Sequence, residues 1–355
     1  MRTMDLDHCV IERYSSSAGT LTCEEKLKGF HYGARASTFD EYGVDMRAEV
    51  VLLERNVEIN ASTDDIGYIL GEPWGCRILV ADFFEADLSR RVGSLNMDSV
   101  SVYNCSQKAT YKSAIKWENA LSGHSKVSNS VIHSGKGMGI LIQGSQNVEL
   151  DNNNVVSFVE NGIWVKSSSR ITITNNQVHD VIPWVDTEPK MFEYPQIWPL
   201  GAMTLSEGTS RMTIKNNIVS GSWHHGYHFK PSKCKERDPD WVFENNVAHS
   251  ISGYGAIALN VANDCTEVRD FWSYKVTEAA IMLGGPSKVN RGTNIHSIDT
   301  RYGIAVHSAG PEAALEEPRA ELHDCKVYAE LRDNMDCAEG QVCDHCTDRT
   351  GMVLN

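Results

Sequence analysis

Three short stretches decide the fold of this chain: Val148-Glu-Leu-Asp-Asn152, Ile171-Thr-Ile-Thr-Asn175 and Met212-Thr-Ile-Lys-Asn216. Each places apolar residues at alternate positions, which is typical of a β-strand with one buried face, and each ends in asparagine. The same phrase recurs more loosely elsewhere, so that six asparagines share it: Asn104, Asn129, Asn152, Asn175, Asn216 and Asn245. Their successive spacings of 25, 23, 23, 41 and 29 residues indicate a stacked repeat rather than a set of unrelated strands.

A second strand follows each asparagine at a nearly constant distance. A small residue stands ten positions after five of the six asparagines: Ala114, Gly139, Gly162, Gly226 and Gly255. After Asn175 the small residue is Gly201, 26 positions on, which indicates an insertion. Short strands in coils of this length predict an all-β fold, a right-handed single-stranded parallel β-helix. We expect the six asparagines to form a hydrogen-bonded ladder at one corner, which is a structural role without chemistry.

The repeat divides the chain into three parts. Residues 1–35 show no clear repeat and are expected to form a leading segment or an N-terminal cap. Residues 36–310 are expected to form the parallel β-helix, with a loop insertion at 181–199, and residues 311–355 a final strand and a cysteine-rich tail. Four of the ten cysteines lie in this last part: Cys325, Cys337, Cys343 and Cys346. A second compact pair of zinc ligands is missing from this part, so the spacing favours disulfides over a zinc site.

Composition narrows the classes of partner. A formal net charge of −14 and a pI near 5.4 disfavour nucleic acid and anionic membranes, because both would repel the chain. No apolar run reaches eighteen residues, so no membrane-spanning segment is predicted. No phosphate loop or dinucleotide fingerprint is present, and we expect no cofactor and no metal site. The first 23 residues do not have the pattern of a signal peptide, while the cysteines indicate an extracellular protein. Together these observations predict either a piece of a longer precursor or an incomplete gene model. The sequence Asn60-Ala-Ser is a predicted N-glycosylation site.

Several stretches resemble one protein family. Leu27-Lys-Gly-Phe-His-Tyr-Gly33 and Leu52-Leu-Glu-Arg-Asn-Val-Glu-Ile59 resemble the start of the β-helix in fibrocystin-like proteins and in the cell-migration-inducing hyaluronidases. Gly221-Ser-Trp-His-His-Gly-Tyr-His-Phe229 and Asn245-Asn-Val-Ala-His-Ser250 are similar to later phrases of that family. The resemblance covers roughly residues 27–310 and implies a large secreted or cell-surface protein, in some members at cilia. One branch of the family is associated with hyaluronan breakdown, but its catalytic residues do not map onto matching positions of this chain.

Histidines form the first candidate site. His133, His179 and His249 follow the repeat on every second coil, and His296 is expected to continue the series. Because consecutive residues of a strand point to opposite faces, this column should face outward. Two interpretations stay open, a solvated polar stripe and a groove that binds a glycan or an ion.

The second candidate site is the stretch Trp223-His224-His225-Gly226-Tyr227-His228. We expect His228 to point outward beside Trp164 and Met203, with the 181–199 insertion folded over them. Aromatic rings flanked by carboxylates suit sugars, whose CH faces stack on rings. The candidate glycan-binding residues are Trp164, Trp184, Trp198, Trp223, His224 and His225. In the alternative, the aromatic residues of the loop only cover an apolar outward stripe made of Leu141, Trp164, Met203 and Ile257.

Two functions compete at this point. The first is an extracellular or cell-surface structural and adhesive β-helix segment that binds glycans or protein partners, within a larger chain or a filamentous assembly. The second is a carbohydrate-active enzyme, a hyaluronidase-like hydrolase or a polysaccharide lyase. Glycoside hydrolysis requires a pair of carboxyl groups or an equivalent acid and base. The candidate catalytic residues are Asp186, Glu207, His179 and His228. No cluster in the sequence is convincing enough to decide for the enzyme.

Overall fold

The computed structural model describes residues 7–29, 31, 47–61, 75–107, 110–182, 201–206, 208–230, 232–235, 238–259, 264–284, 289–307, 319–328 and 352–354. Every regular element in these ranges is a strand. The chain divides into two compact units, residues 1–52 and 53–355. The predicted boundaries at 35 and 310 stay predictions. Residues 183–199 of the predicted 181–199 insertion and the tail cysteines other than Cys325 lie outside the described residues.

The described part of the first unit contains an antiparallel hairpin of β1 (Ile11–Ser15) and β2 (Thr20–Cys23). A disulfide between Cys9 and Cys23 closes it, with the two Cα atoms 5.2 Å apart. The carboxylate of Asp7 accepts hydrogen bonds from the backbone N–H groups of Lys28 and Gly29, each at 2.8 Å. This bond pattern lowers the pKa of Asp7.

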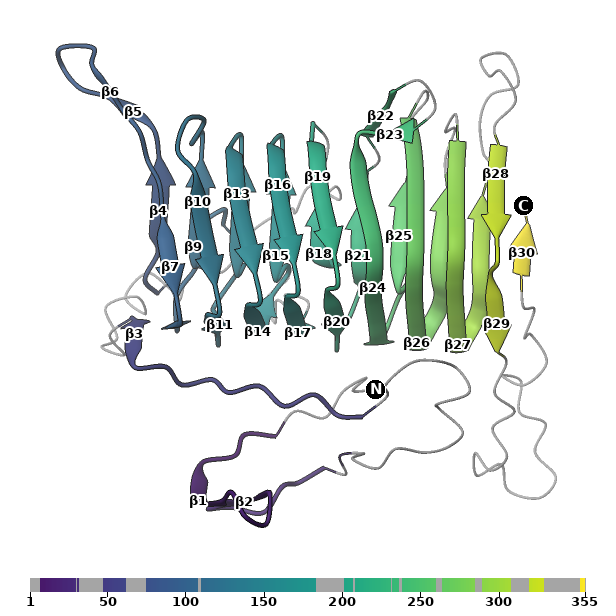
Figure 1. Cartoon of the computed structure of the whole chain (residues 1–355), viewed down its shortest axis with the longest axis horizontal. Coiled ribbons are helices and arrows are strands. Elements are labelled where there is room, and N and C mark those ends of the chain that lie inside the picture. The colour runs from purple at the N-terminus through teal and green to yellow at the C-terminus, as the bar shows by residue number, and fades with distance from the viewer. Residues whose placement is uncertain are drawn as a thin grey trace, which may run out of the picture. The chain divides into compact units, whose positions relative to one another are not determined.

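The second unit is a stack of coils whose strands lie side by side in three parallel sheets (Figure 1). The first sheet holds β7 (Asn96–Asp98), β10 (Ser125–Ser128), β13 (Gln146–Asp151), β16 (Ser169–Thr174), β19 (Ser210–Lys215), β24 (Trp241–Ile251), β26 (Asp264–Gly284), β27 (Val289–His307) and β28 (Arg319–His323). The second sheet holds β3 (Val57–Asn60), β8 (Val100–Tyr103), β11 (Val131–His133), β14 (Asn154–Val159), β17 (Gln177–Ile182), β20 (Ile218–Ser220), the later parts of β24, β26 and β27, and β29 (Lys326–Tyr328).

The third sheet completes each coil. It holds β4 (Ile78–Ala81), β9 (Ile115–Glu118), β12 (Ile140–Gln143), β15 (Ile163–Lys166), β18 (Gly201–Leu205), β21 (His225–Phe229), β25 (Ala256–Leu259), the ends of β26 and β27, and β30 (Met352–Leu354). Two small hairpins project from the coils, β5 (Phe83–Phe84) with β6 (Arg90–Arg91), and β22 (Ser232–Lys235) with β23 (Asp238–Pro239). The arrangement confirms the predicted parallel β-helix.

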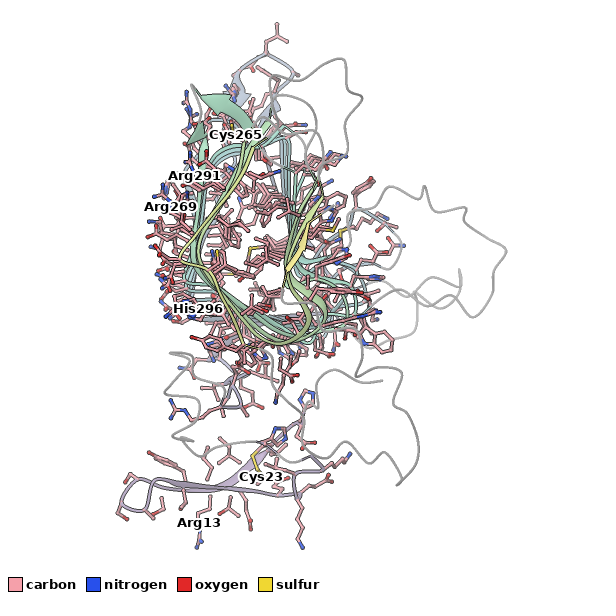
Figure 2. The ribbon with its side chains drawn as sticks, turned by 90° about the vertical axis from the view of Figure 1, so that its right-hand side faces the viewer. Arg13, Cys23, Cys265, Arg269, Arg291 and His296 are labelled. Atoms are coloured by element: carbon pink, nitrogen blue, oxygen red, sulfur yellow. A yellow bond between two sulfur atoms is a disulfide. The ribbon has the colours of Figure 1, made fainter. Side chains whose placement is uncertain are left out.

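The core lies inside the coils. Alternate residues of each strand point inward, and the ribbon closes around them (Figure 2). The bulkiest fully buried side chains are Trp117, Tyr227, Phe158, Phe229, Phe243 and Phe271. Four of these rings pack edge to face or tilted against one another, for example Tyr227 on Phe243 at 5.1 Å. A second disulfide, Cys76–Cys105, joins the first two coils near β4 and β8.

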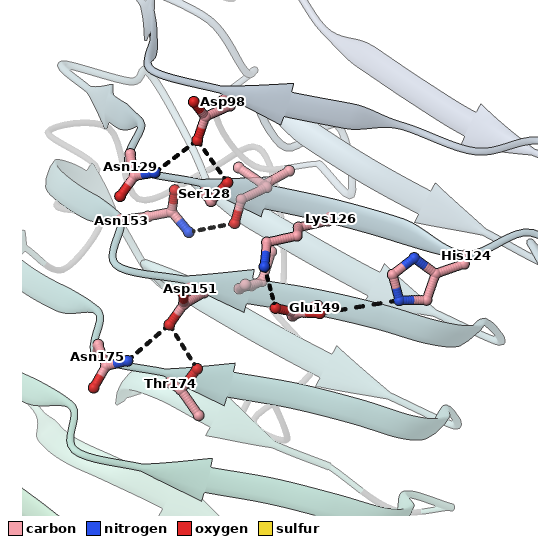
Figure 3. Close-up of polar contacts among 12 residues, drawn as sticks. Asp98, His124, Lys126, Ser128, Asn129, Glu149, Asp151, Asn153, Thr174 and Asn175 are labelled. Carbon is pink, nitrogen blue, oxygen red and sulfur yellow. Dashed lines mark hydrogen bonds and ion pairs between the residues drawn. The ribbon is translucent and has the colours of Figure 1, made fainter.

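Asparagines stack at the corner that follows the first sheet. Asn129, Asn152, Asn175, Asn216 and Asn245 all have positive φ, between 50° and 58°, a conformation that asparagine tolerates better than most residues. Asn152 Nδ2 donates to Asn129 Oδ1 at 2.7 Å, and Asn245 Nδ2 donates to Asn216 Oδ1 at 2.7 Å. Asn175 Nδ2 donates instead to the carboxylate of Asp151 at 2.8 Å (Figure 3). This ladder is exposed.

A second, buried ladder lies one residue further on. It consists of Asn153, Asn176, Asn217 and Asn246, each 0–1% exposed. The Oδ1 atoms of the last three accept from the backbone N–H and from the Nδ2 of the preceding asparagine, as Asn176 does from Asn153 at 3.0 Å for both bonds. Asn153 Oδ1 accepts from the backbone N–H of Ser130 at 3.0 Å. Each Nδ2 also donates to a backbone carbonyl of the preceding coil. The buried ladder therefore supplies acceptors to the backbone N–H groups at this corner.

Two predicted positions differ in the structure. Asn104 does not join the exposed ladder, because Tyr103 pairs with His133 and Asn104 therefore lies at the next corner, level with Ser134. The small residue of the inserted coil is Ala202 rather than Gly201, because Ile163 pairs with Met203. As a result Met203 points into the core, 1% exposed, and Thr204 takes the outward position beside Trp164.

Candidate functional site

The histidine column of the second sheet is a packed structural feature. Its register is His133, Val156, His179, Ser220 and His249, on successive strands. His179 is 2% exposed and its two ring nitrogens hydrogen-bond to Ser220 Oγ at 2.5 Å and Gln177 Oε1 at 3.1 Å. The expectation of an open outward stripe is thus corrected at His179 and at His249, which is 6% exposed.

Aromatic stacking accounts for the rest of this column. The His249 ring lies parallel to Tyr274, with centroids 4.5 Å apart, and His133 stacks on Tyr103 at 5.3 Å. His296 does not continue the series: it pairs with Trp272, two residues before the column position. Since His179 is on β17 and His228 on β21, in different sheets, the register gives them no shared site.

The second candidate stretch forms a cluster at the start of β21. His225 and His228 have their rings in T-shaped contact, 5.8 Å between centroids. The backbone N–H of Tyr254, in the next coil, donates to His225 Nδ1 at 3.3 Å, which leaves Nε2 as the protonated ring nitrogen. His228 points outward as expected, and neither of its ring nitrogens has a hydrogen-bond partner among the described residues.

Burial keeps these imidazoles uncharged. It lowers the pKa of His225 to about 3, with further repulsion from His228 and His224, and it lowers the pKa of His228 to about 4, with a contribution from Lys230. The pKa of His224 is lowered by burial as well. At neutral pH the cluster therefore offers neutral hydrogen-bond donors and acceptors rather than positive charge.

An edge of aromatic and charged side chains continues from this cluster along the following coils. Trp223 is 42% exposed. The Tyr254 ring lies 5.5 Å from that of His225, and burial together with Glu278 and Tyr302 raises its pKa. Arg301 lies 3.9 Å from Glu278 and 5.0 Å from the centre of the Tyr302 ring. We call this set the aromatic edge: Trp223, His224, Tyr254, Glu278, Arg301 and Tyr302. Sequence reasoning found its first two residues and missed the others, which belong to coils far along the chain.

Trp164 lies apart from the aromatic edge. It is 3% exposed and packs with Met138 and Leu141 in a small cluster outside the main core. Its Nε1 donates to Ser206 Oγ at 2.5 Å, and Tyr111 lies 5.7 Å from its ring. The remaining candidates Trp184, Trp198, Asp186 and Glu207 lie outside the described residues.

Metal ligands, membrane-spanning helices and free cysteines are considered next, for the described part of the chain. No group of three His, Cys, Asp or Glu side chains there could hold a metal ion. The described ranges also hold no helix of the length and apolarity that a membrane crossing needs. Cys325 is a free, half-buried thiol, and burial raises its pKa.

Comparisons with known proteins agree with the fold. The family model described as right handed beta helix region matches residues 96–182 and 119–270. Fibrocystin of Canis lupus familiaris is 25% identical over 322 residues, which are 90% of this chain and 7% of that protein. Fibrocystin of Mus musculus is 26% identical over 79% of this chain and 6% of its own length, and fibrocystin-L of Mus musculus is 23% identical over 71% and 6%. The chain thus spans less than a tenth of the length of these relatives.

Solved structures give a weaker likeness. The catalytic domain of a GH87 alpha-1,3-glucanase in complex with nigerose is 12% identical, with a TM-score of 0.35 over 71% of this chain and 59% of that chain. The Dettilon tailspike protein is 15% identical, with a TM-score of 0.35 over 66% of this chain and 54% of that chain. Likenesses this distant carry no argument on function. The family match and the curated relatives together show that this chain carries a fibrocystin-like parallel β-helix region.

Proposed function

We propose that this β-helix is a structural and adhesive segment of a cell-surface protein, and that it binds extracellular glycans through the aromatic edge. The observation that carries the proposal is the combination of exposed Trp223 with the neutral, half-buried imidazole of His224 and the Arg301–Glu278 pair on the following coils. Sugars are bound by rings that stack on their CH faces and by neutral or paired polar groups that hydrogen-bond their hydroxyls.

The disulfides support an extracellular location for the protein. The disulfides Cys9–Cys23 and Cys76–Cys105 lie in the described residues, and Cys265 is also disulfide-bonded. Disulfides persist in oxidising compartments. An association with cilia rests on the family resemblance, and glycosylation of Asn60 rests on its sequence and on its exposed position in β3.

The test is a binding measurement with and without the exposed ring. Hyaluronan, sulfated and neutral oligosaccharides are titrated into the chain by calorimetry, then into Trp223→Ala. We expect at least one class to bind, and the truncation to weaken binding about tenfold, as for an anchoring aromatic residue. Phe84→Ala is the matched control, since Phe84 is 68% exposed but lies on the β5–β6 hairpin. Binding that Trp223→Ala leaves unchanged would contradict the proposal.

One observation supports the rival function, cleavage of a polysaccharide. His228 is neutral at physiological pH, and its two buried ring nitrogens have no hydrogen-bond partner among the described residues. A general base has to be uncharged, so His228 would act as one only if a substrate reached these nitrogens. Incubation with hyaluronan, pectic and sulfated chains distinguishes the two functions. Chain shortening that His228→Gln abolishes would establish the enzyme, whereas binding without shortening favours the adhesive segment.

A further inference from the structure

The described strands at the two ends of the coil stack pair on one side only. Among the described residues, β3, β4 and β7 at one end each pair with one strand of the next coil, and β28, β29 and β30 at the other end pair only with β27. Each such strand presents backbone groups that a further strand could bind. At the first coil, Val57 is 57% exposed and Leu79 is 47% exposed.

The core is half-open at both ends. Ile59 and Ile78 at the first coil pack on the core while remaining partly exposed, and Leu322 and Val327 do the same at the last coil. An added coil at either end would bury this apolar surface, as every internal coil does. At both ends, the exposed apolar surface would be buried by one further coil whose strands pair in parallel with the end strands.

We propose that a second copy of this chain places its first coil on the last coil of this one, so that copies join head to tail in the register of the stack. The register fixes which side chains would then meet. Along one outward column of the second sheet, Glu58 begins the series and Lys326 ends it, because Glu58 pairs with Ser101 and His296 pairs with Lys326. In the joined copies, Lys326 of one lies beside Glu58 of the next.

The chain already uses ion pairs between neighbouring coils. Lys215 Nζ lies 2.7 Å from Glu244 one coil on, and Arg291 Nε lies 3.0 Å from Glu321. Lys126 makes a similar contact with Glu149 at 2.5 Å. Strands of one sheet lie about 4.8 Å apart, so side chains in one column are within reach of each other. A Lys326–Glu58 pair between copies would repeat this geometry.

Two further columns match across the junction. Asn60 begins and Tyr328 ends an outward column, and within the chain Asn60 Nδ2 already donates to the hydroxyl of Tyr103. In the joined copies, Tyr328 of one would lie in the same column as Asn60 of the next. In the inward column between them, Val327 would cover Ile59. These matches favour a second copy over an unrelated partner, because both faces come from this chain.

The contact would be heterologous, with different surfaces on the two copies. Such a contact leaves a free end after each addition and builds a linear assembly rather than a closed dimer. Asn60 lies on the open edge of β3 and is a predicted glycan acceptor. A glycan on Asn60 would occupy the junction and keep copies apart, as edge strands in proteins are commonly protected.

The experiment measures association of the purified chain carrying Ser62→Ala, which removes the acceptor sequence and leaves Asn60. Sedimentation velocity over a range of concentrations should show concentration-dependent species larger than one chain, and electron micrographs linear particles. Lys326→Glu and Glu58→Lys should each raise the dissociation constant about tenfold, because like charges then meet at the junction. The double variant should restore association.

Lys275→Glu is the matched control, since Lys275 is exposed at a corner of β26, and β27 separates it from the last coil. It makes the same charge change away from both ends and should leave association unchanged. A chain that stays single at every concentration would overturn the proposal. So would charge reversals at Lys326 and Lys275 with equal effects, or a double variant that associates no better than the single ones.

Discussion

Replacing Asn176 with alanine tests the buried asparagine ladder. In the folded chain its Nδ2 donates to the carbonyl oxygens of Leu150 and Thr174, at 3.0 and 2.8 Å, and its Oδ1 accepts from the backbone N–H of Asn153 at 3.0 Å. The change leaves two buried donors without this acceptor, the backbone N–H of Asn153 and one side-chain amide hydrogen of Asn153. Each such group costs about 1–3 kcal/mol, so we expect a loss of about 3 kcal/mol in the free energy of opening these coils.

The assay is native-state hydrogen exchange, read peptide by peptide by mass spectrometry. It is chosen because a stack of coils can open locally, so that a single unfolding free energy is not defined. A loss of about 3 kcal/mol raises the exchange rate of the protected amides by about two orders of magnitude. The affected peptides should be those of β13, β14 and β16.

Asn175→Gly is the matched control. Asn175 is the exposed neighbour, its φ of 58° is one that glycine adopts freely, and its amide makes exposed bonds to Asp151 and Asn216. We expect less than about 1 kcal/mol for this change. Equal increases in the hydrogen-exchange rate in Asn175→Gly and Asn176→Ala would refute the claim that the buried ladder stabilises this corner.

Three further predictions concern pH, packing and the disulfide. The pKa values of His225 and His228 are about 3 and about 4, below the 6.5 of an unfolded histidine. The unfolded chain therefore binds more protons, and the free energy of unfolding falls as the pH drops from about 6.5 toward 4. The NMR signals of the two rings should remain those of neutral imidazole at pH 5. Gly255→Ala would place a methyl group 2.5 Å from a carbonyl oxygen of the next coil. We expect this contact to destabilise the fold by about 1–3 kcal/mol, measured as a lower melting temperature. An unchanged melting temperature would mean that the coils are less tightly stacked. Replacing Cys76 and Cys105, 29 residues apart, with alanine should raise exchange in the first two coils by an amount equivalent to about 3 kcal/mol and leave later coils unchanged.

The fold could be predicted because its signal is local and repeated. Alternation in stretches such as Val148-Glu-Leu-Asp-Asn152 marks each strand, and the spacing of the asparagines marks each coil. Asn104 was misplaced because two corners of the coil follow a strand and favour positive φ, so one phrase fits both. The buried ladder was missed although the pairs Asn152-Asn153 and Asn175-Asn176 show it in the sequence. Only the second member of each pair faces the interior.

The candidate site was harder to predict because it depends on the register between strands and on which outward side chains are buried by their neighbours. The insertion before β18 interrupts the repeat, so the predicted register of β18 was wrong by one residue. Met203 was predicted on the outer face, but Thr204 lies there. Strand alternation told which face His179 lies on, but it could not show that this face is packed. Tyr254 and Arg301 join Trp223 only through stacking of coils, which no local pattern shows.

The most direct test of the stacked register is a pair of engineered cysteines across the insertion. Thr172 pairs with Thr213, 41 residues further along, in neighbouring strands of the first sheet. Neighbouring strands place the two Cα atoms within the range that a disulfide spans. The double variant Thr172→Cys with Thr213→Cys should form a crosslink under mild oxidation, detected by peptide mass spectrometry, whereas Thr172→Cys with Lys215→Cys, two positions out of register, should not. A crosslink in the second variant and none in the first would contradict the account.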